Sequence, residues 1–135
     1  MPIVVVTRLR LRDHALVDEF FGVAVQLLEQ ATSSSGILTT DVLADQNDVW
    51  WTLSAWEDRD AIRGYVATDP HHSAMSQIDR FCDQATFVDW QQEDGDLPDW
   101  QTSYRRLVAD GQSATLAHPS PENATRAFPP PVTST

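Results

Sequence analysis

Residues 37–56 read ILTTDVLADQNDVWWTLSAW, and this stretch decides the fold because it predicts a β-hairpin. Its two arms, 37–44 and 49–56, are rich in β-branched and aromatic residues, which favour extended strands. The polar residues between them, Gln-Asn-Asp at 46–48, are typical of a tight turn. Because successive strand residues point to opposite sides, each arm supplies side chains to both faces of a sheet.

The segments on both sides of the hairpin extend this pattern. Residues 3–11, IVVVTRLRL, and residues 85–91, ATFVDWQ, have the composition of a first and a last strand. Before the hairpin, apolar residues recur at spacings of three and four over residues 16–31, which predicts a long helix. A second helical segment follows the hairpin, and the Asp-Pro pair at 69–70 interrupts it and starts a further helix.

The resulting order, β-α-β-β-α-β, is that of the ferredoxin-like α+β fold, an antiparallel sheet with helices on one face. Such a sheet leaves its other face uncovered, and apolar side chains of three strands are candidates to lie there. They are Val4 and Val6, Trp50 or Trp51, and Phe87 or Trp90. A second copy packed face to face would bury them, so we expect a homodimer of the dimeric α+β barrel type.

Composition divides the chain into three parts. Residues 1–92 hold all the predicted strands and form the ferredoxin-like α+β barrel domain. Residues 93–111 begin with an acidic turn and continue with apolar residues at helical spacing, which predicts a C-terminal helical extension. Residues 112–135 are rich in Pro, Ser, Thr and Ala, so we expect a flexible Pro-rich tail there.

The charge of the chain excludes several classes of partner. There are 20 Asp and Glu against 9 Lys and Arg, a formal net charge of −11. Such a chain repels phosphate backbones and anionic lipid headgroups, so we expect no nucleic-acid and no membrane binding. Cys82 is the only cysteine, which excludes an internal disulfide, and no apolar run is long enough to span a membrane. We therefore expect a cytoplasmic protein.

One stretch that begins in the second arm of the hairpin carries a family resemblance. It runs from WTLSAWED at 51–58 through AIRGY at 61–65 to Pro-His at 70–71 and Ala-Met at 74–75. In this stretch and in the element order, residues 3–91 resemble the antibiotic-biosynthesis monooxygenase family. The resemblance implies a homodimer with a small-molecule pocket between the sheet and the helices of each subunit. Several family members oxygenate aromatic polyketides without metal or flavin, so no cofactor is expected.

Two kinds of side chain are candidates for catalysis. His71 and His72 stand at the start of a helix, whose positive end lowers the pKa of a histidine and favours a neutral base. Adjacent helical residues point about 100° apart, so only one of the two faces the pocket well, and the resemblance favours His71. Tyr65 could hydrogen-bond a substrate oxygen or an oxyanion. All three could equally be structural, as capping or surface histidines and a core tyrosine.

Further residues are candidates for substrate binding, and His72 is counted among them. Trp51 and Trp56 could stack on a flat polycyclic ligand, although a core or a dimer seam would use tryptophans too. Thr7 is polar amid apolar strand residues and could donate a hydrogen bond in the pocket. Met75 belongs to the stretch that carries the resemblance, and we include it as a pocket residue.

Other polar residues are weaker indicators of a functional site. Arg8 and Arg10 alternate on one face of the first strand, where they could bind an acidic substrate or lie at an interface or a sheet edge. The histidines at 14, 71, 72 and 118 have no spacing typical of metal ligands, so we expect no metal site.

Three kinds of function stay open, because a fold does not choose its chemistry. The first is a cofactor-independent monooxygenase of an aromatic or polyketide-like substrate in secondary metabolism. The second is a non-oxidative cyclase or isomerase, and the third is a non-catalytic binding protein for a hydrophobic metabolite or haem. The haem-degrading branch of the family has Asn, Trp and His where this chain has Thr7, Tyr65 and Met75, so haem breakdown is the weakest hypothesis.

Overall fold

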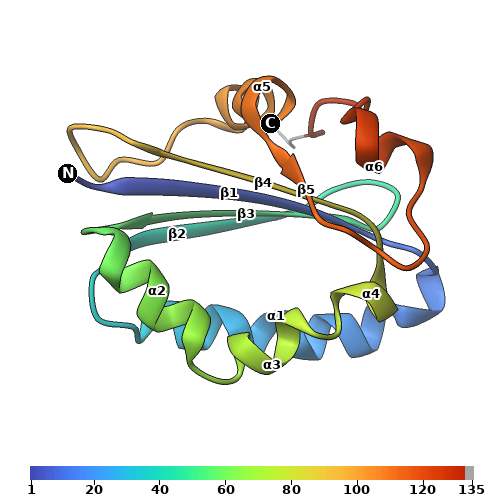
Figure 1. The fold of residues 1–135 in the computed structure, drawn as a ribbon, viewed down its shortest axis with the longest axis horizontal. Helices are drawn as coiled ribbons and strands as arrows, with labels where there is room; N and C mark the ends of the chain where they lie inside the picture. Colours follow the sequence, from blue (N-terminus) through green and yellow to red (C-terminus); the bar gives the residue numbers. More distant parts are fainter. Residues whose placement is uncertain (133–135) are drawn as a thin grey trace.

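The structure is a computed structural model that describes residues 1–132. Its centre is a five-stranded antiparallel sheet in the order β2-β3-β1-β4-β5 (Figure 1). The strands are β1 (Ile3–Leu11), β2 (Ile37–Ala44), β3 (Val49–Trp56), β4 (Cys82–Gln91) and the short β5 (Gln112–Ser113). Because β1 lies between β3 and β4, as the ferredoxin-like order requires, the predicted fold class is confirmed.

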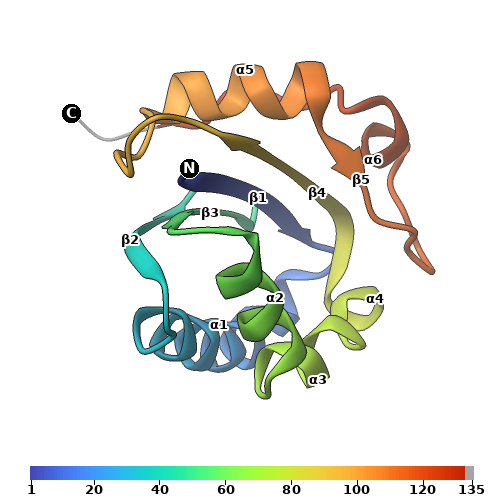
Figure 2. The ribbon, with the colours of Figure 1, turned by 60° about the vertical axis from the view of Figure 1, so that its left-hand side comes forward.

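Helices lie on both sides of this sheet. A 3₁₀ turn (His14–Leu16) leads into α1 (Val17–Thr32), and α2 (Arg59–Ala67), α3 (His71–Met75) and α4 (Ile78–Phe81) follow the hairpin. Near the C-terminus come α5 (Trp100–Asp110) and α6 (Pro121–Thr125). Figure 2 shows α1 to α4 against one face of the sheet and α5 against the opposite one. We call these the helix face and the α5 face.

The strand register assigns each side chain to one of these faces. Thr7 of β1 pairs with Thr52 of β3 and with Phe87 of β4, so these three side chains point the same way. Leu9, two residues along β1, packs in the cluster that α1 covers, which places all of them on the helix face. Trp51 follows the opposite parity and therefore lies on the α5 face.

Aromatic side chains close one end of the helix face. Phe20 of α1 packs against Trp50, with ring centroids 5.4 Å apart, and against Phe81 at 5.7 Å. Leu11 and Cys82 are buried in the same cluster. Burial raises the pKa of the Cys82 thiol to about 12, so this side chain acts as an uncharged core residue.

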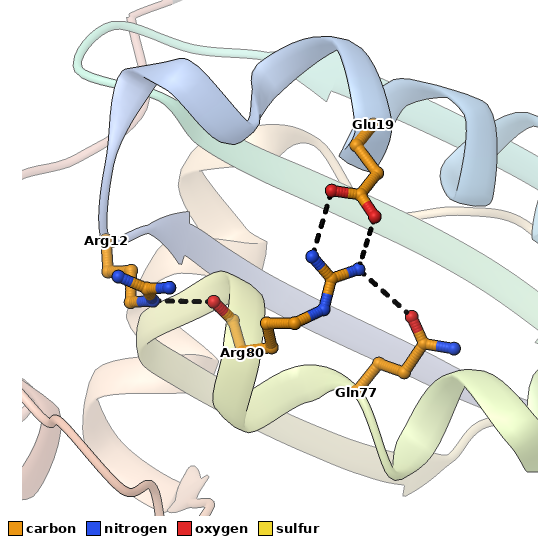
Figure 3. A network of polar contacts seen from close by, with 4 residues as sticks. All are labelled: Arg12, Glu19, Gln77 and Arg80. Atoms are coloured by element: carbon orange, nitrogen blue, oxygen red, sulfur yellow. Dashed lines mark hydrogen bonds and ion pairs between the residues drawn. The ribbon is translucent and has the colours of Figure 1, made fainter.

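A polar network outside this cluster fastens α4 to α1 (Figure 3). The guanidinium of Arg80 donates to both carboxylate oxygens of Glu19, at 2.9 and 2.5 Å, and to the side chain of Gln77 at 3.4 Å. The Arg80 carbonyl accepts a hydrogen bond from Nε of Arg12 at 2.6 Å. These groups are exposed to solvent, which screens their charges, so the network orients α4 more than it stabilises the fold.

The α5 face is covered, whereas a bare face was predicted. Leu107 of α5 is fully buried against a cluster that includes Val6, Trp51 and Leu53. The prediction was wrong because it treated residues 93–111 as an extension beyond the sheet. The chain instead turns back after β4 and lays α5 over its own strands (Figure 2).

Residues 112–132 also differ from the expectation of a flexible tail. They bury Leu116 and Phe128, and Phe128 joins the cluster under α5. The Asn123 side chain fastens the segment, since its oxygen accepts the N–H of Ala85 and its Nδ2 donates to the Ala114 carbonyl. The Asn123 amide thus supplies hydrogen bonds that a neighbouring β-strand would otherwise make. A segment with little regular secondary structure can therefore still pack against the sheet. The remainder of the predicted tail, 133–135, lies outside the described residues.

Candidate functional site

His71 begins α3, at the corner where the chain turns out of α2. Its backbone N–H donates to Oε1 of Gln30 at 2.8 Å, and its ring lies 4.5 Å from the ring of Tyr65. Burial lowers the pKa of His71, and the Val66 carbonyl offsets this shift only in part. Nδ1 is buried and has no hydrogen-bond partner among residues 1–132. The imidazole is therefore neutral at pH 7 and keeps one nitrogen unused.

The rings of Tyr65 and Trp56 extend the aromatic packing from His71 to the sheet. The ring of Tyr65 lies 5.1 Å from the ring of Trp56, which is buried at the end of β3. The Tyr65 hydroxyl donates to the Leu27 carbonyl at 3.2 Å, and Nε1 of Trp56 donates to Oγ of Ser54 at 2.9 Å. Burial raises the pKa of Tyr65 to about 12, so its hydroxyl stays protonated and can donate but not act as a base. We call the stack of His71, Tyr65 and Trp56 the α2–α3 corner.

Gln30 of α1 holds this corner together, although no pattern in the sequence had indicated it. Its Nε2 donates to the carbonyls of Tyr65 and Thr68, at 3.0 and 2.9 Å, while its Oε1 accepts from the N–H of His71. One side chain thus satisfies backbone groups on both sides of the α2–α3 junction, which fixes the position of the His71 ring. All three partners are backbone groups, so no pattern of side chains along the sequence could have revealed its role.

A solvent-exposed rung crosses the middle of the helix face. It consists of Val42, Thr52, Thr7 and Phe87, which pair in this order across β2, β3, β1 and β4. Thr52 is exposed and Phe87 is 41 % exposed, although both lie on the side where the helices pack. The helices therefore do not cover the sheet between its aromatic end and Trp56. Thr7 is half-buried in this exposed rung, where its hydroxyl can hydrogen-bond a ligand that lies on the sheet.

The structure does not bring three predicted site residues into the corner. Trp51 is fully buried on the α5 face, where its Nε1 donates to Oδ2 of Asp45 at 3.0 Å. It cannot line a pocket together with His71, because its side chain points away from the helix face. His72 is exposed, and Met75 at the end of α3 is 51 % exposed, so neither packs into the stack. The predicted residues that do share the helix face are Thr7, Trp56, Tyr65 and His71.

An open hollow of about 650 Å³ borders the corner. Gln30 and Tyr65 form part of its wall, together with the carboxylates of Glu57, Asp58 and Asp60. These charges disfavour an anionic ligand there. An anion bound near His71 is therefore disfavoured in this hollow.

The polar groups at the corner and the exposed rung are an imidazole, a phenol and hydroxyls. In the part of the chain that the structure describes, no three or more His, Cys, Asp or Glu side chains are grouped so that they could hold a metal ion. Within the same residues, no helix has both the length and the apolar character to cross a membrane.

Comparison with family models adds an independent observation. Residues 2–77 match the model named antibiotic biosynthesis monooxygenase, and they include the whole α2–α3 corner. Among curated proteins, no sequence matches the chain significantly.

Solved structures share the fold at low sequence identity. SnoaB, a cofactor-independent oxygenase from Streptomyces nogalater, is 14 % identical, with a TM-score of 0.57 over 69 % of this chain and 94 % of its own. A structure named antibiotic biosynthesis monooxygenase is 19 % identical, with a TM-score of 0.61 over 68 % of this chain and 99 % of its own. Rv0793 from Mycobacterium tuberculosis is 10 % identical, with a TM-score of 0.63 over 70 % and 97 %. Part of the present chain thus has no counterpart in these proteins.

Proposed function

The chain belongs to the antibiotic biosynthesis monooxygenase family, and on this premise we propose that it oxygenates a small aromatic or polyketide-like molecule without a cofactor. The observation that carries the proposal is His71, whose neutral ring has an unpartnered Nδ1 and belongs to the helix face that the exposed rung crosses. The reaction type has support from SnoaB, a cofactor-independent oxygenase with the same fold.

The proposed reaction takes all its electrons from the substrate. A phenol or anthrone first loses a proton and becomes an electron-rich anion that can itself reduce dioxygen. For an anthrone, the methylene carbon becomes a ketone: one oxygen atom enters the product, the other leaves as water, and the O–O bond breaks. The oxidised carbon supplies the electrons, so the balance needs no further reductant. The protein has to provide a proton acceptor and surroundings that stabilise the anion.

His71 is the proposed proton acceptor. Its lowered pKa keeps the imidazole neutral in the range where a base is needed. Nδ1 can take up a proton without breaking a hydrogen bond to any of residues 1–132. Gln30 keeps the ring in place through the His71 backbone N–H and not through a ring nitrogen.

The other residues of the proposed site hold the substrate. A flat molecule that lies on the exposed rung would contact Phe87 and receive a hydrogen bond from Thr7. Trp56 and Tyr65 form an apolar wall beside His71. The Tyr65 hydroxyl donates its hydrogen bond to the Leu27 carbonyl at 3.2 Å. If a substrate oxyanion replaces this carbonyl as the acceptor, the protonated hydroxyl would stabilise it.

Oxygen consumption with a panel of anthrones and hydroquinones tests the proposal. The wild-type protein is expected to consume oxygen only with substrate, and His71→Gln is expected to lower kcat/KM by about a hundredfold or more. His118→Gln replaces an exposed histidine outside the corner and is expected to retain wild-type activity. Full activity of His71→Gln would remove the proposed role of this residue.

The same assay separates the alternative functions. Turnover that continues unchanged without oxygen would assign a non-oxidative cyclase or isomerase instead. Tight binding of the panel compounds without turnover would assign a binding protein.

The predicted homodimer stays a prediction, and its interface needs a different location. It was argued from an uncovered sheet face, and α5 together with residues 112–132 covers that face within one chain. Face-to-face packing of two sheets would require α5 to leave Val6 and Trp51, so we propose that a dimer forms through another surface.

A further inference from the structure

Arg8 of β1 is only 3 % exposed, which is rare for a cation. It lies on the α5 face, with its guanidinium carbon 4.1 Å from the ring centroid of Phe128 and 5.6 Å from that of Trp51. Nη1 donates to Oε1 of Gln84 at 2.5 Å, whereas Nε is buried and has no partner among residues 1–132. Removing a cation from water is costly unless an anion compensates for it.

Within the described chain, no carboxylate forms an ion pair with Arg8. Asp45 is near enough to favour the charged guanidinium, but its oxygens already accept hydrogen bonds from Trp51 Nε1 and from the backbone N–H groups of Gln46 and Val132. Burial lowers the pKa of Arg8 to about 10, which still leaves it charged at neutral pH. Arg8 thus carries a full positive charge without an anion of its own.

Arg10 lies on the same face of β1, and its only ion pair among the described residues is a long contact with Asp83. Its Nε lies 3.9 Å from Oδ1 of Asp83, too far for a hydrogen bond, and both atoms are buried without a partner in residues 1–132. The charges of Arg8 and Arg10 repel each other, which contributes to the lowered pKa of Arg8. In a chain with 9 Lys and Arg against 20 Asp and Glu, two neighbouring cations with unused donors indicate an anion that residues 1–132 do not supply.

Both arginines line a cavity of about 270 Å³ beneath the C-terminal segment. Val49, Phe128 and Pro129 give this cavity apolar walls. A guanidinium offers donors that match the two oxygens of a carboxylate, so we propose that the cavity binds a small monocarboxylate whose hydrocarbon part lies against these walls. This site is on the α5 face, and it is independent of the function proposed for the α2–α3 corner.

The charges of the lining favour one negative charge over two. The carboxylates of Asp45 and Glu122 also line the cavity, and within residues 1–132 neither forms an ion pair with Arg8 or Arg10. A dianion such as phosphate would bring its second charge toward one of these carboxylates, which costs affinity. The volume of the cavity suits a short aliphatic or single-ring acid better than a polycyclic one.

Calorimetric titration of the full-length protein with butyrate and benzoate tests this proposal. Both are expected to bind saturably, whereas neutral butyramide and benzamide are expected not to bind, because they lack the charge that the arginines need. Phosphate is expected to bind more weakly than butyrate. In arginine side-chain NMR spectra, the Nε resonances of Arg8 and Arg10 are expected to shift with the same saturation curve.

Arg10→Gln is the deciding variant, because the Arg10 side chain is 38 % exposed and its replacement leaves the core intact. Its affinity for butyrate is expected to fall about tenfold or more, since a charge-assisted hydrogen bond is lost. Arg63→Gln removes an equal charge from a surface ion pair with Asp60 and is expected to bind like the wild type. No saturable binding by the wild type, equal affinity of Arg10→Gln, or tighter binding of phosphate than of butyrate would each overturn the proposal.

Discussion

The two faces of one sheet are packed in opposite ways. On the α5 face, Val6, Trp51 and Leu107 are fully buried, and Phe128 from the C-terminal segment joins them. On the helix face, packing is tight at the ends, while the rung through Thr7 stays open. Closely packed apolar surface contributes stability, and open surface beside polar groups provides room for a ligand. The difference places the proposed oxygenation site on the open helix face, whereas the α5 face holds the main apolar core together with the separate cavity of Arg8 and Arg10.

Two tryptophans of β3 illustrate this division. Trp51 and Trp56 are both buried, and the indole N–H of each donates a hydrogen bond. Because the strand alternates, Trp51 joins the core beneath Leu107, whereas Trp56 stacks on Tyr65 in the α2–α3 corner. Residue type and burial alone therefore do not distinguish a core aromatic from a site aromatic, and the face on which it lies does.

The largest expected effect on stability comes from a substitution that leaves a void under α5. Leu107→Ala is expected to lower the free energy of unfolding by about 4 kcal/mol, because Leu107 is fully buried. Leu28→Ala on α1 makes the same chemical change at a side chain that is 36 % exposed, and it is expected to cost about 1 kcal/mol or less. Urea unfolding of both variants measures the difference. Equal losses would contradict the contrast between the two faces.

The packing of the C-terminal segment is the next test. Phe128→Ala is expected to cost about 3 kcal/mol of unfolding free energy, since it removes a ring that is 4 % exposed and lies over the Arg8 guanidinium. Val132→Ala, at an exposed position of the same segment, is expected to change the unfolding free energy by less than about 0.5 kcal/mol. If Phe128→Ala were as mild as Val132→Ala in thermal and urea unfolding, residues 112–132 would not be part of the α5 face.

A smaller loss is expected from the hydrogen bonds that fasten this segment. Asn123→Ala leaves the N–H of Ala85 and the carbonyl of Ala114 without their side-chain partner, which is expected to cost about 2 kcal/mol. Gln112→Ala, at an exposed position nearby, serves as the control and should unfold at the wild-type urea concentration. Asn123→Ala is expected to raise the hydrogen exchange of the Ala85 amide, and unchanged exchange would refute the assigned bond.

The smallest expected effect concerns the helix face and pH. The pKa of His71 is lowered in the folded protein, so between that value and the ordinary value of about 6.5 the unfolded chain binds more protons. This contribution to stability is fully present above the ordinary pKa and is lost as the pH falls through this window. His71→Gln is therefore expected to flatten the acid side of the stability profile, measured by urea unfolding at a series of pH values. A profile that keeps its wild-type slope would mean that the His71 pKa is not lowered by folding.

Much of the fold could be predicted because its information is local. The predicted hairpin arms at 37–44 and 49–56 coincide with β2 and β3, since a period-two pattern flanked by a polar turn needs no distant contact to be recognised. The long helix at 16–31 nearly coincides with α1, because its apolar stripe repeats over several turns.

The candidate site could be predicted only in part. The alternation of side chains along a strand divides them between the two faces of the sheet, but it does not say which face α1 to α4 cover. Trp51 was therefore predicted to share a pocket with His71, although it lies on the opposite face. Thr52 and Phe87 were missed as lining of the exposed rung for the same reason. Gln30 was missed because its partners are backbone groups of α2 and α3, which no side-chain pattern encodes.

The sequence by itself determined the element order, the hairpin, the family stretch around the α2–α3 corner and the acidic character of the chain. Only the tertiary structure decided that α5 and residues 112–132 seal one face of the sheet, which leaves the exposed rung on the other face and two arginines in a cavity. The physical reason is that strands and helices arise from short periodic patterns. The docking of a distant, irregular segment depends instead on many weak contacts, none of which has a period that could be recognised along the chain.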